Sequence, residues 1–170
     1  MKRTRLRFIW FVTILAVLAG ILLYTRMGST PNIKKKIYSQ WSKEYVVTKD
    51  KLSYIRTTNS KTEDVVLSEA QGYGMVIAVD AAKQGDASSA DFEKLYQYYL
   101  AHRLKDTQLM SWKQTIKDGK SNHEDENNAT DGDLYIAYAL IQAAKQWPDK
   151  AKEYQDQAQA ILKDVLAYNY

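Results

Sequence analysis

Two carboxylates, each placed just before an apolar segment, are the residues in this sequence best suited to chemistry. Glu69 precedes the apolar run 75–82, and Asp131 precedes the run 134–141. In an antiparallel array of helices such ends can converge on one face, and two carboxylates in one cleft can cleave a glycosidic bond. The competing interpretation is purely structural: Glu69 complements a helix dipole and Asp131 caps a helix.

This chemistry carries a condition. A helix N-terminus favours the ionised form of a carboxyl group, whereas a general acid must hold its proton. Acid catalysis by Glu69 therefore requires burial or a second anion nearby, and Asp131 is the natural source of that anion.

Segment 129–147 is the helix that would position Asp131. Its apolar residues recur at three- and four-residue spacings, which predicts one stripe facing a core: Leu134, Ala137, Leu140, Ile141 and Ala144. Thr130 or Asp131 is a suitable N-cap, and Pro148 should end the helix after Trp147. Asp131 would then lie where the core meets solvent.

Segment 68–82 is the helix that would position Glu69, with Ser68 as a possible cap. Gly72 and Gly74 stand near its head, and each glycine costs a helix about 1 kcal/mol. Such glycines are tolerated where a backbone packs closely or a ligand approaches. We therefore expect close packing or a binding site beside this turn.

The remaining elements follow from periodicity and turn signals. Polar residues 57–64 and 123–128 are expected to be loops, the second of them near a cleft rim. Short strands are predicted at Val46-Val47 and at 52–55, around a turn at 49–51. Further helices are predicted at 33–45, at 91–103 with an apolar face of Phe92, Leu95, Tyr96 and Tyr99, and at 149–168.

Composition excludes several function classes. The 170 residues suffice for one ordinary domain, and an apolar share of 45% is typical of globular chains. There is no cysteine, which excludes disulfides and thiol catalysis. The net charge of +4 comes largely from the N-terminus and Lys34 to Lys36, so we expect no nucleic-acid partner. His102 and His123 are too isolated for a metal site, and we expect neither a metal nor a cofactor.

The N-terminus has the pattern of a membrane segment. Residues 1–7 form a basic segment expected in the cytoplasm, residues 8–25 an anchor or signal sequence, and residues 26–32 a linker. The apolar run 8–24 would span roughly 26 Å as a helix, close to the hydrocarbon thickness of a bilayer. The absence of a clear small-residue cleavage site favours a membrane anchor with the remainder outside the cell, and secretion after cleavage is the alternative.

Three segments resemble glycoside hydrolase family 8. Residues 68–75 (SEAQGYGM) look like the family's acid-bearing motif, residues 129–147 match its signature helix, and residues 109–113 (LMSWK) are similar to its short aromatic segment. Order and spacing also agree, so the resemblance covers roughly Tyr45 to Tyr170, and we expect residues 33–170 to be the N-terminal portion of the family's catalytic domain. One departure is Ala70, where the family usually has glycine.

The resemblance implies an all-α fold, a partial (α/α)6 barrel with about half of its helices and a small β-hairpin. It implies inverting hydrolysis of a β-linked polysaccharide or oligosaccharide, with Glu69 as general acid and Asp131 holding the sugar. The family's general base is a later aspartate, and nothing before Tyr170 matches its motif. We therefore expect a truncated chain that lacks the C-terminal half of the domain and exposes apolar edges of its inner helices.

Three aromatic residues are candidates for binding substrate. Trp112 can stack on a sugar ring or pack in the core, and both interpretations stay open. Tyr73 could hydrogen-bond the substrate or Glu69, and Tyr138, on the face of Asp131, could line the cleft. In contrast, Trp147, Tyr96 and Tyr99 are expected in the core.

Three functions remain open. The first is an endo-β-glycanase such as a β-1,4-glucanase, with the cell's own exopolysaccharide as an alternative substrate of the complete enzyme. The second is a non-catalytic carbohydrate-binding fragment. The third is a helical interaction protein without a sugar site, which would require both motifs to be coincidental.

Overall fold

The computed structural model describes residues 2–26, 30–58, 62–117 and 120–169, and the chain divides into two compact units, residues 1–39 and 40–170. The first unit contains α1 (Lys2–Tyr24) and the beginning of α2 (Thr30–Tyr45). Segment Arg5–Tyr24 of α1 is exposed and is long and apolar enough to cross a membrane, a test that a signal sequence also passes. Of the predicted linker, residues 27–29 lie outside the described residues, and α2 already begins at Thr30.

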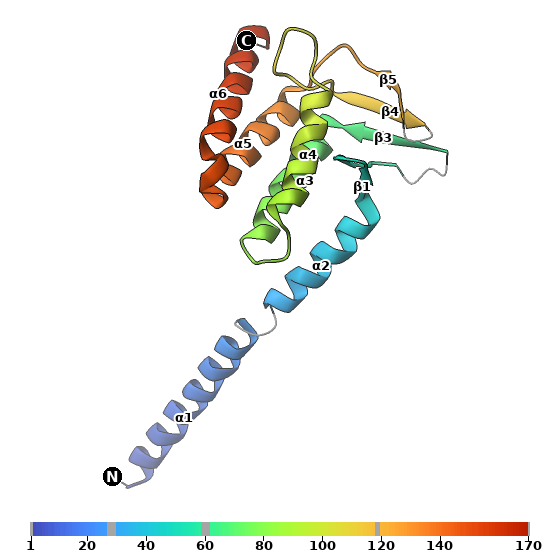
Figure 1. Cartoon of the computed structure of the whole chain (residues 1–170). Coiled ribbons are helices and arrows are strands. Elements are labelled where there is room, and N and C mark those ends of the chain that lie inside the picture. Colours follow the sequence, from blue (N-terminus) through green and yellow to red (C-terminus); the bar gives the residue numbers. More distant parts are fainter. Residues whose placement is uncertain (1, 27–29, 59–61, 118–119, 170) are drawn as a thin grey trace. The chain divides into compact units, whose positions relative to one another are not determined.

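The second unit is a layer of helices with strands at one end (Figure 1). α3 packs mainly on α5 and also on α4, while α5 packs on α6. Pro148 begins a short 3-10 helix that separates α5 from α6, so the predicted end of the signature helix is confirmed. The bounds are α3 (Ser68–Ala82), α4 (Ser89–Ala101), α5 (Thr130–Gln146), the 3-10 helix Pro148–Lys150 and α6 (Ala151–Tyr168).

The strands form two small sheets. The predicted hairpin is present as β1 (Val46–Lys49) and β2 (Leu52–Ile55), paired antiparallel. A second, three-stranded antiparallel sheet consists of β3 (Glu63–Leu67), β4 (Lys113–Lys117) and β5 (Lys120–Glu124). The sequence analysis did not predict this sheet. The loops predicted at 57–64 and 123–128 are wrong at residues 63–64 and 123–124, which lie in strands, and no element was predicted for residues 114–122.

Burial explains why β3 and β4 are strands. Val66, Gln114 and Ile116 are buried, and the last two alternate with less buried neighbours along β4, the period of two expected of a strand with one covered face. β5 is exposed along its whole length. Its pairing with β4 therefore depends on backbone hydrogen bonds, a signal that a hydrophobic pattern does not carry.

Aromatic side chains fill the core between α4 and α6. Phe92, Leu95, Tyr96 and Tyr99 of α4 are all buried, as predicted. The ring of Phe92 lies 5.4 Å from that of Tyr154 on α6, at an edge-on angle that suits two aromatic quadrupoles. Trp147 is only partly buried and packs against this core.

The buried stripe of α5 differs from the prediction. Ala137, Leu140 and Ala144 are buried as expected, but Leu134 and Ile141 are exposed. The actual buried face also includes Asp133 and small residues, among them Gly132, Ala139 and Ala143. α5 is apolar around most of its circumference, so spacing alone could not identify the covered side.

Candidate active site

The N-terminal ends of α3 and α5 meet at two glycines. A Cβ atom added to Gly132 would lie 2.8 Å from the backbone nitrogen of Glu69 and 2.7 Å from the Cβ of Ser68. A Cβ atom added to Gly72 would lie 2.6 Å from the Cβ of Tyr135. Real Cβ atoms do not approach so closely, so only glycine allows this contact. It brings the backbone beside Asp131 against the backbone of Glu69, and the predicted close packing is confirmed at Gly72.

Neither α3 nor α5 has the side-chain N-cap that the sequence suggested. The residue before α5 is Ala129 and the residue before α3 is Leu67, and neither makes a side-chain cap. Ser68 and Asp131 therefore lie inside the first turns of their helices. The Asp131 Oδ1 accepts a hydrogen bond from the backbone N–H of Gly132 at 2.7 Å, and the residue is exposed at the helix end.

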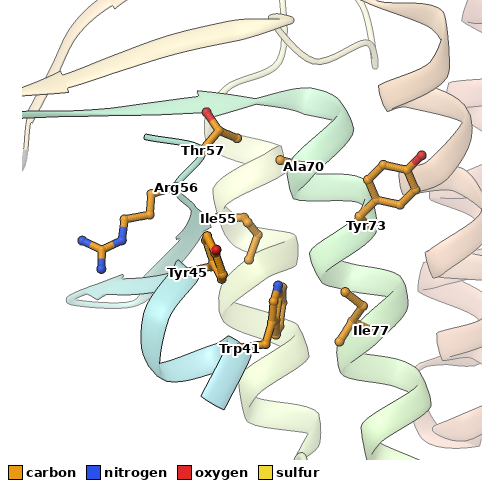
Figure 2. Close-up of a pocket in the computed structure, with 8 residues that line it drawn as sticks. All are labelled: Trp41, Tyr45, Ile55, Arg56, Thr57, Ala70, Tyr73 and Ile77. Carbon is orange, nitrogen blue, oxygen red and sulfur yellow. The ribbon is translucent and has the colours of Figure 1, made fainter. Parts of the chain in front are cut away.

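Tyr73 connects the Glu69 side of the site to α5. Its ring centroid lies 4.2 Å from that of Tyr135, and Figure 2 shows its ring turned toward the neighbouring helix. Hydrogen bonding to Tyr135, partial desolvation, and the charge and hydrogen bond of Glu69 raise the pKa of Tyr73 to about 12. The Tyr73 hydroxyl therefore stays protonated near neutral pH and can donate a hydrogen bond to the Glu69 carboxylate.

Trp112 is tied to the start of α3 by its backbone. Its carbonyl accepts the N–H of Ser68 at 2.9 Å, and its own N–H donates to the carbonyl of Asn127 at 2.8 Å. The side chain is half-buried, and the Lys113 ammonium lies 5.7 Å from the ring centroid. The backbone of Trp112 therefore lies beside the first turn of α3, while its side chain is hydrogen-bonded to Asp125 and keeps part of its surface open.

Tyr138 is the candidate least involved in packing. Half of its surface is exposed, and it shares a face of α5 with Asp131 and Leu134. Seven residues correspond to about two helical turns, so its Cα lies about 10 Å along the axis from that of Asp131. Nothing in the described residues gives Tyr138 a specific partner in the site.

A shallow pocket of about 420 Å³ adjoins Tyr73 on the side away from α5. Figure 2 shows Trp41 and Tyr45 of α2 on one side of it and Tyr73 and Ile77 of α3 on the other. Its lining is mainly apolar and aromatic, with Arg56 and Thr57 at one end. The Arg56 Nε donates to the carbonyl of Glu44 at 2.7 Å, so part of its hydrogen-bonding capacity is already used.

Two buried polar residues that the sequence analysis did not single out support these positions. Gln71 of α3 is fully buried; its Oε1 accepts the N–H of Ile55 at 3.0 Å, and its Nε2 donates to the carbonyls of Ser53 and Leu95. Gln71 thereby attaches the hairpin and α4 to the turn that carries Glu69. The sequence did contain a sign of this role: Gln71 is a polar residue in a mainly apolar helix, and a buried amide must find several hydrogen-bond partners.

Asp133 is the second of these residues. Its side chain is fully buried, with Oδ1 accepting the N–H of Met110 at 2.8 Å and Oδ2 accepting the Asn128 amide at 2.8 Å. Burial raises the pKa of Asp133 to about 6, although the two hydrogen bonds oppose that shift. The sequence signal was its position, three residues before Ile136 on what proves to be the covered face of α5.

Comparison with known proteins identifies the family of this chain. The family model for glycosyl hydrolases family 8 matches residues 14–170. The chain is 37% identical over 124 residues to a β-glucanase of Niallia circulans, and 33% identical over 166 residues to an endoglucanase of Bacillus sp. (strain KSM-330). These matches cover 72% and 89% of this chain, but 29% and 35% of those proteins.

Solved structures agree. A β-1,3-1,4-glucanase from Paenibacillus sp. X4 superposes with a TM-score of 0.65 at 29% identity, over 82% of this chain and 36% of that one. An endoglucanase from Komagataeibacter sucrofermentans superposes with a TM-score of 0.61 at 33% identity, over 79% of this chain and 38% of that one. The chain thus spans about a third of the length of the relatives it matches. On the match over residues 14–170, the chain belongs to glycoside hydrolase family 8.

Proposed function

We propose that this chain supplies the acid side of an inverting endo-β-glycanase site, with Glu69 as general acid and Asp131 as the residue that holds the sugar. The observation that supports this most directly is the contact at Gly132, where the backbone beside Asp131 meets the backbone of Glu69. Trp112, Tyr73 and Tyr138 are proposed to contact the saccharide. Glucan is the favoured substrate class, because the relatives are described as β-glucanases and endoglucanases.

The proposal requires polypeptide beyond these 170 residues. An inverting site needs a general base roughly 6.5–9.5 Å from the acid, so that a water molecule fits between them. The matched region is about a third of the length of the relatives. Further helices, completing an (α/α)6 barrel, would supply the base and cover exposed apolar residues of α3 and α5 that the saccharide does not contact: Ile77, Leu134 and Ile141.

The N-terminal helix is proposed to anchor the protein in the cell membrane, with the site outside the cell. Its length and apolar character support this. Secretion after cleavage is the alternative. Mass spectrometry of the N-terminus, together with membrane fractionation, distinguishes the two: an intact Met1 in the membrane fraction supports the anchor, and a cleaved N-terminus in the medium contradicts it.

The direct test joins this chain to the remaining part of the Niallia circulans β-glucanase and measures the release of reducing sugar from β-glucan, chitosan and xylan. E69Q should lower turnover by about 10²–10⁴-fold, the usual contribution of a general acid, with oligosaccharide binding retained. The control is E63Q, which changes an exposed glutamate in β3. Wild-type turnover in E69Q would contradict the acid assignment. Circular dichroism checks that a loss of turnover is not caused by a loss of fold.

A binding function without catalysis is the second candidate, because the chain matches only a third of its relatives and no segment resembles the base motif. Titration of the full chain with cello-oligosaccharides, followed by isothermal titration calorimetry, tests it. Saturable binding that W112A abolishes, without release of reducing sugar, would favour this candidate for the chain alone.

A further inference from the structure

We propose that Asp133 is a positioning residue: its buried carboxylate ties segment 109–112 to the first turn of α5 and thereby holds Glu69 and Trp112 in register with Asp131. The proposal rests on the proposed function for its catalytic consequence. Its structural part concerns contacts that can be measured in this chain without any activity.

The first step is the contact between α5 and segment 109–112. Asp133 Oδ1 accepts the Met110 N–H at 2.8 Å, and the residue lies in the same turn as Asp131 and Gly132. A carboxylate that accepts a backbone N–H in a buried setting makes one of the stronger hydrogen bonds in proteins. Met110 is itself fully buried, so an unpaired N–H there would be costly.

The second step runs along the segment to α3. Two residues after Met110, the carbonyl of Trp112 accepts the N–H of Ser68 at 2.9 Å, and Glu69 is the next residue. Between them, Ser111 is fixed on both sides: its N–H donates to the His102 carbonyl at 3.0 Å, and its Oγ donates to the Asp125 carbonyl at 2.7 Å. Only two peptide units separate Met110 from Trp112, so we expect the loss of the Met110 bond to affect the Ser68 amide that Trp112 accepts.

The third step concerns the other carboxylate oxygen. Oδ2 accepts the Asn128 amide at 2.8 Å, and the same amide group donates to the Asn169 Oδ1 at 3.2 Å. Asp133 therefore connects the residues that precede α5 with the end of α6. Both oxygens face donors, so an isosteric amide cannot replace the carboxylate without turning an NH₂ group toward Asn128.

This geometry allows a rescue experiment. D133N sets its amide donor against the amide donor of Asn128, and segment 109–112 should loosen. In the double variant N128D/D133N, the amide introduced at position 133 can accept from Met110 and donate to the carboxylate introduced at position 128. That carboxylate can also accept from the Asn169 amide, as the Asn128 Oδ1 does in the wild type. The net charge is kept and the clash of donors at position 133 is removed, while the bond from Asn128 to the Asn169 Oδ1 is lost, because a carboxylate cannot donate. N128D alone is therefore the control for that lost bond. A residue that matters only for bulk packing would show no such rescue.

The test uses the full 170-residue chain in detergent micelles, with amide hydrogen exchange followed by NMR. D133N should speed exchange of the Met110 and Ser68 amides about tenfold, as expected for the loss of one hydrogen bond to a charged acceptor. N128D/D133N should restore most of the protection. The matched control is D164N, which neutralises the carboxylate that accepts the Gln108 N–H at 2.6 Å, two residues before Met110, and should leave Ser68 unchanged.

The pH dependence of the Met110 amide gives an independent readout. The other charged or titratable groups that act on Asp133 are Asp131 of α5 and, across the helix interface, Tyr99 of α4. Tyr99 is neutral in the acid range, so the Met110 shift should follow the ionisation of Asp133 and lose its main transition in D133N. If D133N leaves Ser68 exchange unchanged, or if the double variant fails to restore it, the proposal is wrong.

The catalytic consequence is tested in the hybrid with the Niallia circulans sequence. D133N should lower kcat more than it raises KM, and N128D/D133N should recover kcat. If the wild-type hybrid cleaves no polysaccharide, the proposed function fails, while the exchange experiment still decides the role of Asp133.

Discussion

Two contacts hold the ends of the candidate site, and they differ in kind. α3 meets α5 through close packing at Gly72 and Gly132, where the neighbouring atoms leave no room for a Cβ. Segment 109–112 meets the same turn of α5 through the hydrogen bond from the Met110 N–H to the Asp133 carboxylate, whose other oxygen accepts the Asn128 amide. The packed contact is insensitive to pH and intolerant of added volume. The polar contact depends on which groups are donors and acceptors, and it responds to protonation.

Of the two substitutions at the packed contact, Gly132→Ala should destabilise the chain more. An alanine normally stabilises a helix relative to glycine by about 1 kcal/mol, but here its Cβ would meet the Glu69 nitrogen at 2.8 Å. Overpacking of this kind costs about 1–3 kcal/mol or more. Urea unfolding should show a clear net loss. A gain in stability would mean that the two helices are not in close contact there.

Gly72→Ala should show the same behaviour with a smaller loss. Its Cβ would lie 2.6 Å from the Tyr135 Cβ and 3.1 Å from the Gly132 carbonyl oxygen. Only this one atom lies closer than 3.0 Å to the added Cβ, whereas three atoms do at Gly132, so a smaller displacement relieves the contact. We therefore expect about 1–2 kcal/mol of destabilisation by urea unfolding. L134A, an exposed change on α5, serves as the control with little effect.

The polar contact should show itself in the pH dependence of stability. Burial raises the pKa of Asp133 from its usual 3.8 to about 6. Its contribution to stability is therefore fully present below about pH 4 and is lost as pH rises to about 6. At about 1.4 kcal/mol per pKa unit, the loss is about 3 kcal/mol.

The measurement is urea unfolding of wild type and D133N at several values between about pH 4 and 7. Burial lowers the pKa of His102, so its contribution changes in the opposite direction, and the difference between the two proteins is the quantity to compare. That difference should change by about 3 kcal/mol across the range. Parallel curves would show that Asp133 ionises as freely in the folded chain as in the unfolded one.

Ser68→Ala should have the smallest effect. The Ser68 hydroxyl is buried and has no hydrogen-bond partner among the described residues. Removing it should leave stability within about 0.5 kcal/mol of wild type, or raise it slightly. A loss of about 1 kcal/mol, typical of a removed N-cap, would restore the cap role that the sequence suggested for Ser68.

The sequence indicated the family and the candidate site residues more readily than the details of the fold around them. Glu69 and Asp131 stood at predicted helix starts, and their motifs indicated the family that the comparison then established. The β3–β5 sheet was missed because β5 is polar and exposed throughout. Asp133 was overlooked because the spacing of apolar residues put the covered face of α5 at Leu134, which is exposed.

The junction between β3 and α3 also limits what changes in length the chain can accept. β3 pairs with β4 up to Leu67 opposite Lys113, and the next backbone bond, from Ser68 to Trp112, already belongs to the helix start. No loop separates strand from helix. A one-residue deletion inside 63–67 would turn Val66 from the covered face to the open one, or rotate the Glu69 side chain by about 100° around α3. Insertions and deletions in this family should therefore avoid that strand.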